Sequence, residues 1–196
     1  MRLKESPSQT AGPYVHIGAT PNATGIEGVY AEDLGLGLMN AEAMGQRIVV
    51  TGRIFDGASA PVTDALVEIW QADAKGIYPG QKNADPDFSG WGRQAVDGET
   101  GVFRFETIKP GSAPFRDGRP MAPHITFWIV ARGINLGLHT RMYFADEAKA
   151  NAADPVLARL EQPGRRATLI APVSQDMVYT FDIHLQGDNE TVFLDV

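Results

Sequence analysis

A chain of 196 residues, 43% of them hydrophobic and 21% charged, is long enough for one ordinary globular domain. Its formal net charge is -7 and the sequence has no basic stripe, which disfavours a nucleic-acid partner. No apolar run reaches the roughly 18 residues of a membrane span. Cysteine is absent, which excludes disulfides, thiolate metal sites and a cysteine nucleophile.

The first 20 residues are predicted to form an extended N-terminal arm, and residues 21–196 a single domain. Two prolines, Pro7 and Pro13, stiffen the arm. The N-terminus has no apolar run typical of a signal peptide, so a cytoplasmic protein is expected. Residues 21–46 are rich in glycine and alanine with weak periodicity, which predicts an irregular segment.

Short segments with a two-residue alternation, separated by turn residues, predict strands in the rest of the chain. In the first of them Ile48, Val50 and Ile54 alternate with other residues. The later ones are residues 66–70, 102–105, 125–130, 179–185 and 192–196. Residues 125–130 are almost wholly apolar, which is typical of a central strand covered on both faces. The pattern predicts a mainly β protein, a single-domain β-sandwich with short peripheral helices.

Helix signals are confined to one region. Asp154 is a suitable N-cap, Pro155 suits the first helical position, and Pro163-Gly164 is expected to end the helix. The alanine-rich residues 146–153 predict a second short helix just before it.

No two of the four histidines have the spacing of metal ligands; they are His16, His124, His139 and His184. His184 lies opposite the apolar face of its strand and is expected at the sheet surface, and His139 shares a strand face with Arg141. His124 and Thr126 point to one face of their strand, where a pair of histidines could chelate a metal. Threonine is a poor ligand, so the sequence predicts no chelate there.

A series of motifs runs in order along nearly the whole chain. They are residues 7–14 (PSQTAGPY), 68–73 (EIWQAD), 85–88 (DPDF), 92–93 (GR), 107–111 (TIKPG), 123–125 (PHI), 132–135 (RGIN) and 138–144 (LHTRMYF). Together they resemble those of the intradiol aromatic-ring dioxygenases, which cleave a catechol ring between its two hydroxyls with Fe(III) and O2. The fold implied by the resemblance is a β-sandwich, in agreement with the predicted strands.

The departures from the family pattern concern the metal. The iron in that family is held by two tyrosines and two histidines, the histidines in a His-Ile-His run, and this chain has Thr126 as the third residue of the run. One tyrosine position falls on Ala113, and the other on Gly80, or on Tyr78 if the loop shifts by two residues. The family's arginine before the first histidine falls on Met121. The resemblance therefore implies that this chain holds no metal and supplies no catalytic residue of its own.

The resemblance further implies an alpha type of subunit, active only with an iron-bearing beta subunit in an alpha–beta hetero-oligomer. Fe(III) is then held by the partner, and this chain lines the partner's active site. The implied substrate is protocatechuate (3,4-dihydroxybenzoate), which O2 opens to 3-carboxy-cis,cis-muconate. The residues implied to bind it are Arg132, Thr10, Gly12, Pro13 and Tyr14.

Spacing separates Arg132 from the position of His124. Eight residues at about 3.3 Å each place them roughly 26 Å apart, so one small aromatic acid cannot touch both. Arg132 is then expected to serve another pocket, the alternative being a surface arginine in the turn before Gly133. For the whole chain, the alternative is a binding or scaffold protein on the same sandwich, without a catalytic partner. A self-sufficient iron enzyme conflicts with Ala113 and Thr126.

Overall fold

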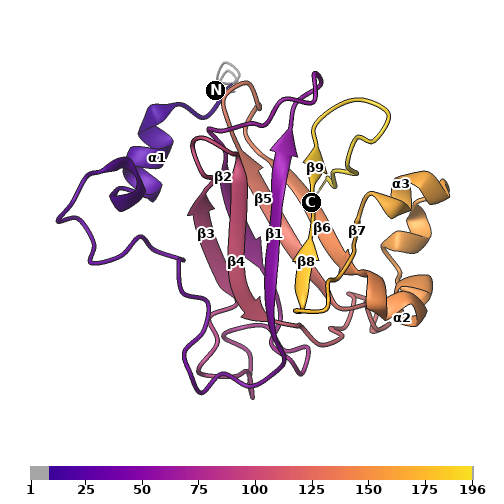
Figure 1. Ribbon diagram of the computed structural model, residues 1–196. Coiled ribbons are helices and arrows are strands. Elements are labelled where there is room, and N and C mark those ends of the chain that lie inside the picture. Colours follow the sequence, from indigo (N-terminus) through magenta and orange to yellow (C-terminus); the bar gives the residue numbers. More distant parts are fainter. Residues whose placement is uncertain (1–8, 196) are drawn as a thin grey trace, which may run out of the picture.

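The structure is a computed structural model, and it describes residues 9–195; Pro7, Ser8 and Val196 of the motifs and strands above lie outside that range. Its strands are β1 Arg47–Phe55, β2 Leu66–Trp70, β3 Trp91–Ala95, β4 Val102–Ile108, β5 His124–Val130, β6 Leu138–Phe144, β7 Ile170–Ala171, β8 Val178–Thr180 and β9 Ile183–His184. They form two sheets packed face to face (Figure 1). One sheet has the order β4-β1-β8, with β9 also paired to β1, and the other has the order β3-β2-β5-β6-β7. The predicted mainly β sandwich is confirmed.

The helices are short and lie at the two sides of the sandwich. They are α1 Pro13–Ala19, α2 Ala148–Ala153 and α3 Pro163–Ala167, with 3-10 turns η1 Asn22–Thr24, η2 Ala145–Glu147 and η3 Leu157–Arg159. Figure 1 shows α2 and α3 beside β7, with α1 on the opposite side of the molecule. Across residues 9–195, no helix is long and apolar enough to span a bilayer.

The core lies between the two sheets and is built from the alternation read in the sequence. Ile48, Val50 and Ile54 of β1 are buried against Phe127 of β5 and its apolar neighbours. A side chain at position 52 could not be accommodated, because a Cβ on Gly52 would lie 2.0 Å from the carbonyl oxygen of Phe181, in the segment between β8 and β9. This close approach lets the C-terminal segment pair in parallel with β1.

Strand β5 differs from the expectation that both of its faces would be covered. Ile125, Phe127 and Ile129 are fully buried in the core, as expected. Thr126 and Trp128 on the other face are only half-buried, because none of the helices within residues 9–195 covers the middle of this sheet. One outer face of the sandwich is therefore partly open.

The helix predicted from Asp154 onward is wrong in extent. Asp154 does cap the chain, since its Oδ1 accepts the backbone N–H groups of Val156 and Leu157, each at 2.8 Å. Only the turn η3 follows, and the Pro163-Gly164 pair begins α3 instead of ending a helix. The physical reason is that the Asp154 carboxylate is fully buried and bonded to other segments, which ties the chain down at this point. The helix predicted over 146–153 is confirmed by η2 and α2.

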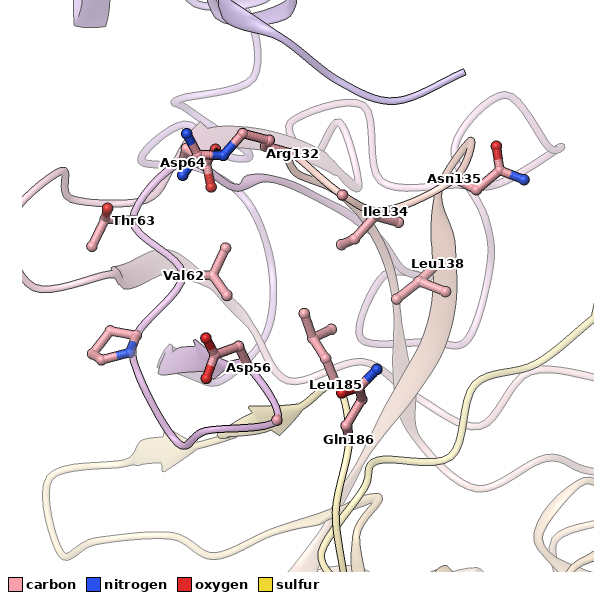
Figure 2. A pocket seen from close by; sticks show the side chains of 13 residues that line it. Asp56, Val62, Thr63, Asp64, Arg132, Ile134, Asn135, Leu138, Leu185 and Gln186 are labelled. Carbon is pink, nitrogen blue, oxygen red and sulfur yellow. Dashed lines mark ion pairs between the residues drawn. The ribbon is translucent and has the colours of Figure 1, made fainter. Parts of the chain in front are cut away.

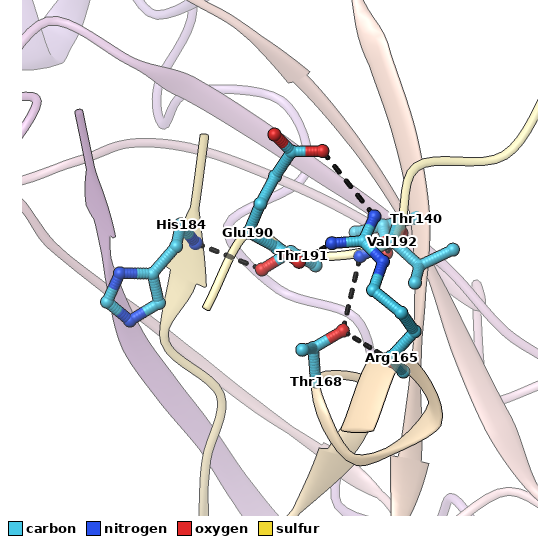
Figure 3. A network of polar contacts seen from close by, with 7 residues as sticks. All are labelled: Thr140, Arg165, Thr168, His184, Glu190, Thr191 and Val192. Atoms are coloured by element: carbon cyan, nitrogen blue, oxygen red, sulfur yellow. Dashed lines mark hydrogen bonds and ion pairs between the residues drawn. The ribbon is translucent and has the colours of Figure 1, made fainter. Parts of the chain in front are cut away.

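The last predicted strand, 192–196, is not found in its described part. The backbone of Val192 is instead held by hydroxyls: its N–H donates to Thr168 Oγ1 at 3.2 Å, and its carbonyl accepts Thr140 Oγ1 at 2.7 Å (Figure 3). Thr191 Oγ1 likewise accepts the backbone N–H of His184 at 2.9 Å. These side-chain bonds replace the ladder that a strand would need. Strand β3, by contrast, was missed, because its sequence WGRQA has no apolar alternation.

The N-terminal arm is not extended throughout. Residues 9–12 are extended, and Thr10 bridges Asn135. Pro13 then occupies the first turn of α1, a position that its fixed φ favours. The expectation of an extended arm is thus wrong for residues 13–19, and Ala11 packs against this chain's own Leu66 and Val130.

Candidate functional site

The partly open face of the five-stranded sheet, here called the outer face, carries all three tryptophans of the chain. Because Ile69 and Phe127 point into the core, their strand neighbours point outward. Trp70 pairs with Trp91 on one side and Thr126 on the other. The remaining tryptophan, Trp128, lies on β5 opposite His139 of β6. The two ends of β5 on this face differ in chemistry.

The first end, here called the closed end, is built around His124. Its Nδ1 lies 2.8 Å from the carbonyl oxygen of Ala122, and its Nε2 lies 3.4 Å from Tyr78 Oη. A carbonyl can only accept, so Nδ1 carries the proton and donates it. Nε2 then accepts from the Tyr78 hydroxyl.

Burial keeps these groups neutral. It lowers the pKa of His124 to about 4, helped by the positive charge of Arg141. Burial also raises the pKa of Tyr78, with Arg141 opposing the shift. The pKa of Tyr143 is raised by burial and by the Asp154 carboxylate, which accepts its hydroxyl at 3.2 Å. The closed end therefore holds a neutral imidazole and two neutral phenols near pH 7.

Apolar side chains fill the rest of the closed end. Ala113 and Met121 are buried and pack with Tyr78, and Arg141 Nη1 lies 3.5 Å from Met121 Sδ. Of the two positions left open for a tyrosine, it is Tyr78 that reaches His124; Gly80 is exposed.

The donor set of the closed end does not fit ferric iron. Tyr78 and His124 are two possible ligands, while Ala113 and Thr126 offer no phenolate and no imidazole. No cluster of three or more His, Asp or Glu side chains suited to a metal occurs between residues 9 and 195.

The second end, here called the open end, is the turn that follows β5. Thr10 holds it: its Oγ1 accepts the backbone N–H of Gly133 at 2.9 Å and donates to the carbonyl of Ala131 at 3.3 Å. Between these two residues, the Arg132 side chain is 85% exposed, and its Nε lies 3.5 Å from Asp64 Oδ2. The backbone is fixed while the guanidinium reaches solvent.

Arg132 and Asp64 stand between two hollows. One, of about 250 Å³, is lined by Gly12, Pro13 and His16 of the N-terminal segment together with these two residues and Ala11. The other, of about 550 Å³, opens toward the β1–β2 connection, and Figure 2 shows Asp64 and Arg132 together at its edge. The open end thus offers a cation at the mouth of a space large enough for a small acid.

Most of the predicted substrate-binding residues are brought together. Thr10 holds the Arg132 turn, and Gly12 and Pro13 line the smaller hollow with it. Tyr14 is 85% exposed on α1 and is not among the residues that line this hollow. His16 and Asp64 were missed, because only the packing of α1 and the register of β2 against β5 bring them to Arg132.

Comparison with known proteins gives consistent matches. The family model described as Dioxygenase matches residues 26–187. The protocatechuate 3,4-dioxygenase alpha chain of Pseudomonas putida is 46% identical, over 98% of this chain and 97% of its own length. The beta chain from Burkholderia cepacia is 39% identical, over 82% of this chain and 77% of its own. Among solved structures, the dioxygenase domain of a carbohydrate-binding fusion protein from Streptomyces sp. SirexAA-E has a TM-score of 0.60 and 28% identity, covering 85% of this chain and 96% of that one.

Proposed function

Because the chain belongs to the intradiol ring-cleavage dioxygenase family, we propose that it is an alpha-type, non-iron-binding subunit of a protocatechuate-cleaving enzyme. The assembled enzyme opens protocatechuate with O2 to 3-carboxy-cis,cis-muconate. The observation that carries the proposal is the difference between the two ends of β5: the family's metal position is filled with apolar side chains, while Arg132 stands exposed beside a hollow. The cytoplasmic location expected from the sequence stays a prediction.

The family's Fe(III) is assigned to a beta-type partner. The closed end of this chain provides two of four expected ligands, and a neutral, buried His124 is already bonded to Ala122 and Tyr78. The beta chain of Burkholderia cepacia, a relative that carries the name of the companion subunit, supports an alpha–beta hetero-oligomer.

The surface of the chain supports such a partner. Large apolar side chains are exposed on α1 and along residues 21–46, among them Tyr14, Ile17, Val29, Tyr30, Leu34, Leu36 and Met44. The half-open outer face adds Trp70, which is 40% exposed and stacks on Tyr78. Aromatic and apolar side chains gathered in this way are typical of protein interfaces. An obligate interface above about 2,000 Å² in total is expected.

Within the assembly, Arg132 is proposed to bind the substrate carboxylate. Protocatechuate is an anion at neutral pH. Its two hydroxyls would face the metal proposed for the partner, so its carboxylate would point to the opposite wall. A guanidinium there pairs with it through charge-assisted hydrogen bonds and offsets the cost of desolvating the anion. Thr10 fixes the turn, and Gly12 and Pro13 form the neighbouring wall, while Tyr14 is exposed beside them on α1.

The test is expression of the chain with and without a beta-type partner. Alone, it is expected to be colourless, free of stoichiometric iron and prone to self-association, because its apolar surface lacks a cover. Co-expressed, the complex is expected to contain iron, to be coloured and to cleave protocatechuate. Stoichiometric iron in the lone chain by elemental analysis would overturn the assignment of the metal. A stable, monodisperse lone monomer would favour the scaffold alternative.

A further inference from the structure

The register of β2 against β5 places Asp64 opposite Arg132. Leu66 pairs with Val130 in the antiparallel ladder, and both side chains lie on the outer face. Asp64 precedes Leu66 by two residues and Arg132 follows Val130 by two, so the same alternation continues past the ends of both strands. The ion pair of 3.5 Å between Arg132 Nε and Asp64 Oδ2 is the result.

The backbone next to both Asp64 and Arg132 is buried and held in place. Ala65 and Leu66, which follow Asp64, are 0% and 1% exposed, and Ala131, which precedes Arg132, is fully buried. The two side chains are nevertheless 42% and 85% exposed. Orientation of the guanidinium therefore depends on Asp64, because a free arginine side chain samples many rotamers.

The contact of Asp64 with the guanidinium of Arg132 is at Nε. A guanidinium has five N–H donors, and the edge formed by its two terminal nitrogens matches a carboxylate in a bidentate pair. The carboxylate of Asp64 comes nearest to the guanidinium at Nε, and Arg132 lines the hollow with Gly12 and Pro13, so a bidentate carboxylate there would use the terminal edge.

We propose that Asp64 is a positioning residue that orients Arg132 for the substrate carboxylate. The inference rests on the proposed function and adds a residue that acts through Arg132 without touching substrate. The direction of the change in substrate binding on removal of Asp64 distinguishes this role from a purely electrostatic one. If Asp64 only added negative charge near the site, its removal would strengthen binding of an anionic substrate; as an orienting partner, its removal weakens that binding.

The test is steady-state kinetics of the assembled alpha–beta enzyme carrying Asp64→Asn, which keeps size and removes charge. KM for protocatechuate is expected to rise about 2–5-fold, the range of an exposed ion pair, with kcat unchanged. KM for catechol, which lacks the carboxylate, is expected to stay the same, and Asp64→Glu is expected to restore most of the loss. Asp117→Asn is the matched control, because the Asp117 side chain is 45% exposed, close to the 42% of Asp64, and pairs with Arg119 at 2.8 Å elsewhere on the chain.

A double-mutant cycle separates this inference from the role of Arg132. In an Arg132→Leu background, Asp64→Asn is expected to cause no further change, since there is no guanidinium to orient. A lower KM in Asp64→Asn, an equal rise for catechol, or a full effect in the Arg132→Leu background would overturn the role of Asp64. If Asp64→Asn reduces the preference for protocatechuate over catechol and Arg132→Leu does not, both roles are overturned. If Arg132→Leu has the expected selective effect on protocatechuate and Asp64→Asn has no effect, only the role of Asp64 is overturned.

Discussion

Both ends of strand β5 carry titratable or charged side chains, which are buried at one end and exposed at the other. At the closed end, His124, Tyr143 and Asp154 are buried and bonded to one another or to backbone. At the open end, Arg132 and Asp64 are exposed, and their ion pair is long. The first arrangement contributes to folding, whereas an exposed pair contributes little to it. The fold does not require the two exposed charges of Arg132 and Asp64, although their backbone is fixed. A role in binding explains them better than a role in folding.

If the partner holds the metal as proposed, apolar side chains take the places of family residues at the closed end. Ala113 and Met121 stand at positions of a ligand and of an arginine in the family pattern, and both pack against Tyr78. Buried positions without ligands would otherwise leave a cavity, which destabilises a protein in proportion to its volume. Changes at the closed end should thus alter stability, and changes at the open end should alter substrate binding.

Loss of the Asp154 carboxylate is expected to destabilise the closed end strongly. Asp154→Ala removes the carboxylate that accepts the N–H groups of Ala122, Val156 and Leu157 and the Tyr143 hydroxyl. Leaving these buried donors unpaired is expected to lower the free energy of unfolding by about 4 kcal/mol. Denaturant unfolding of the complex measures this, with the exposed Asp188→Ala as control. Equal, small effects of both substitutions would contradict the distinction between the two ends.

At the open end, Arg132→Leu is expected to act on binding. KM for protocatechuate should rise by the equivalent of about 1.5–3 kcal/mol, the range for a hydrogen bond to a charged group, with little change in unfolding. KM for catechol should change much less. Arg141→Leu, at the closed end, should show no such preference between substrates. Equal losses for protocatechuate and catechol in Arg132→Leu would mean that Arg132 holds the interface together instead of binding substrate.

The closed end should also respond to acid. Between pH 6.5 and 4 the unfolded chain binds a proton at His124 that the folded chain excludes, because burial lowers the folded pKa from 6.5 to about 4. Stability therefore falls as the pH is lowered through this window, by about 2 kcal/mol at pH 5 from this group. Thermal unfolding of the wild type and of His124→Gln from pH 7 to 5 checks the sign. The variant should lose less stability, and identical pH profiles would contradict a neutral buried imidazole.

Sequence patterns predicted the fold better than they predicted the site. Alternation located β1, β2, β4 and β5 because apolar periodicity records which face is buried. It could not locate β3, whose one buried position, Gly92, carries no apolar side chain. Asp64 and Arg132 are 68 residues apart in sequence, and their pairing depends on the register of β2 against β5, which no local pattern specifies. The loop shift that brings Tyr78 to His124 is likewise set by packing on Trp70.

Replacing His124 is expected to leave the iron of the assembled enzyme unchanged. His124→Ala removes the residue that matches the family's first histidine ligand, so a metal held by this chain would be lost with it. The closed end is filled, and His124 Nε2 already accepts the Tyr78 hydroxyl, so the iron content and colour per assembled complex are expected to equal those of the wild type. Some stability should be lost with the bond to Ala122, which is why both quantities are normalised to folded complex. Elemental analysis and the visible spectrum decide the matter, and a proportional loss of iron would place the metal at His124 after all.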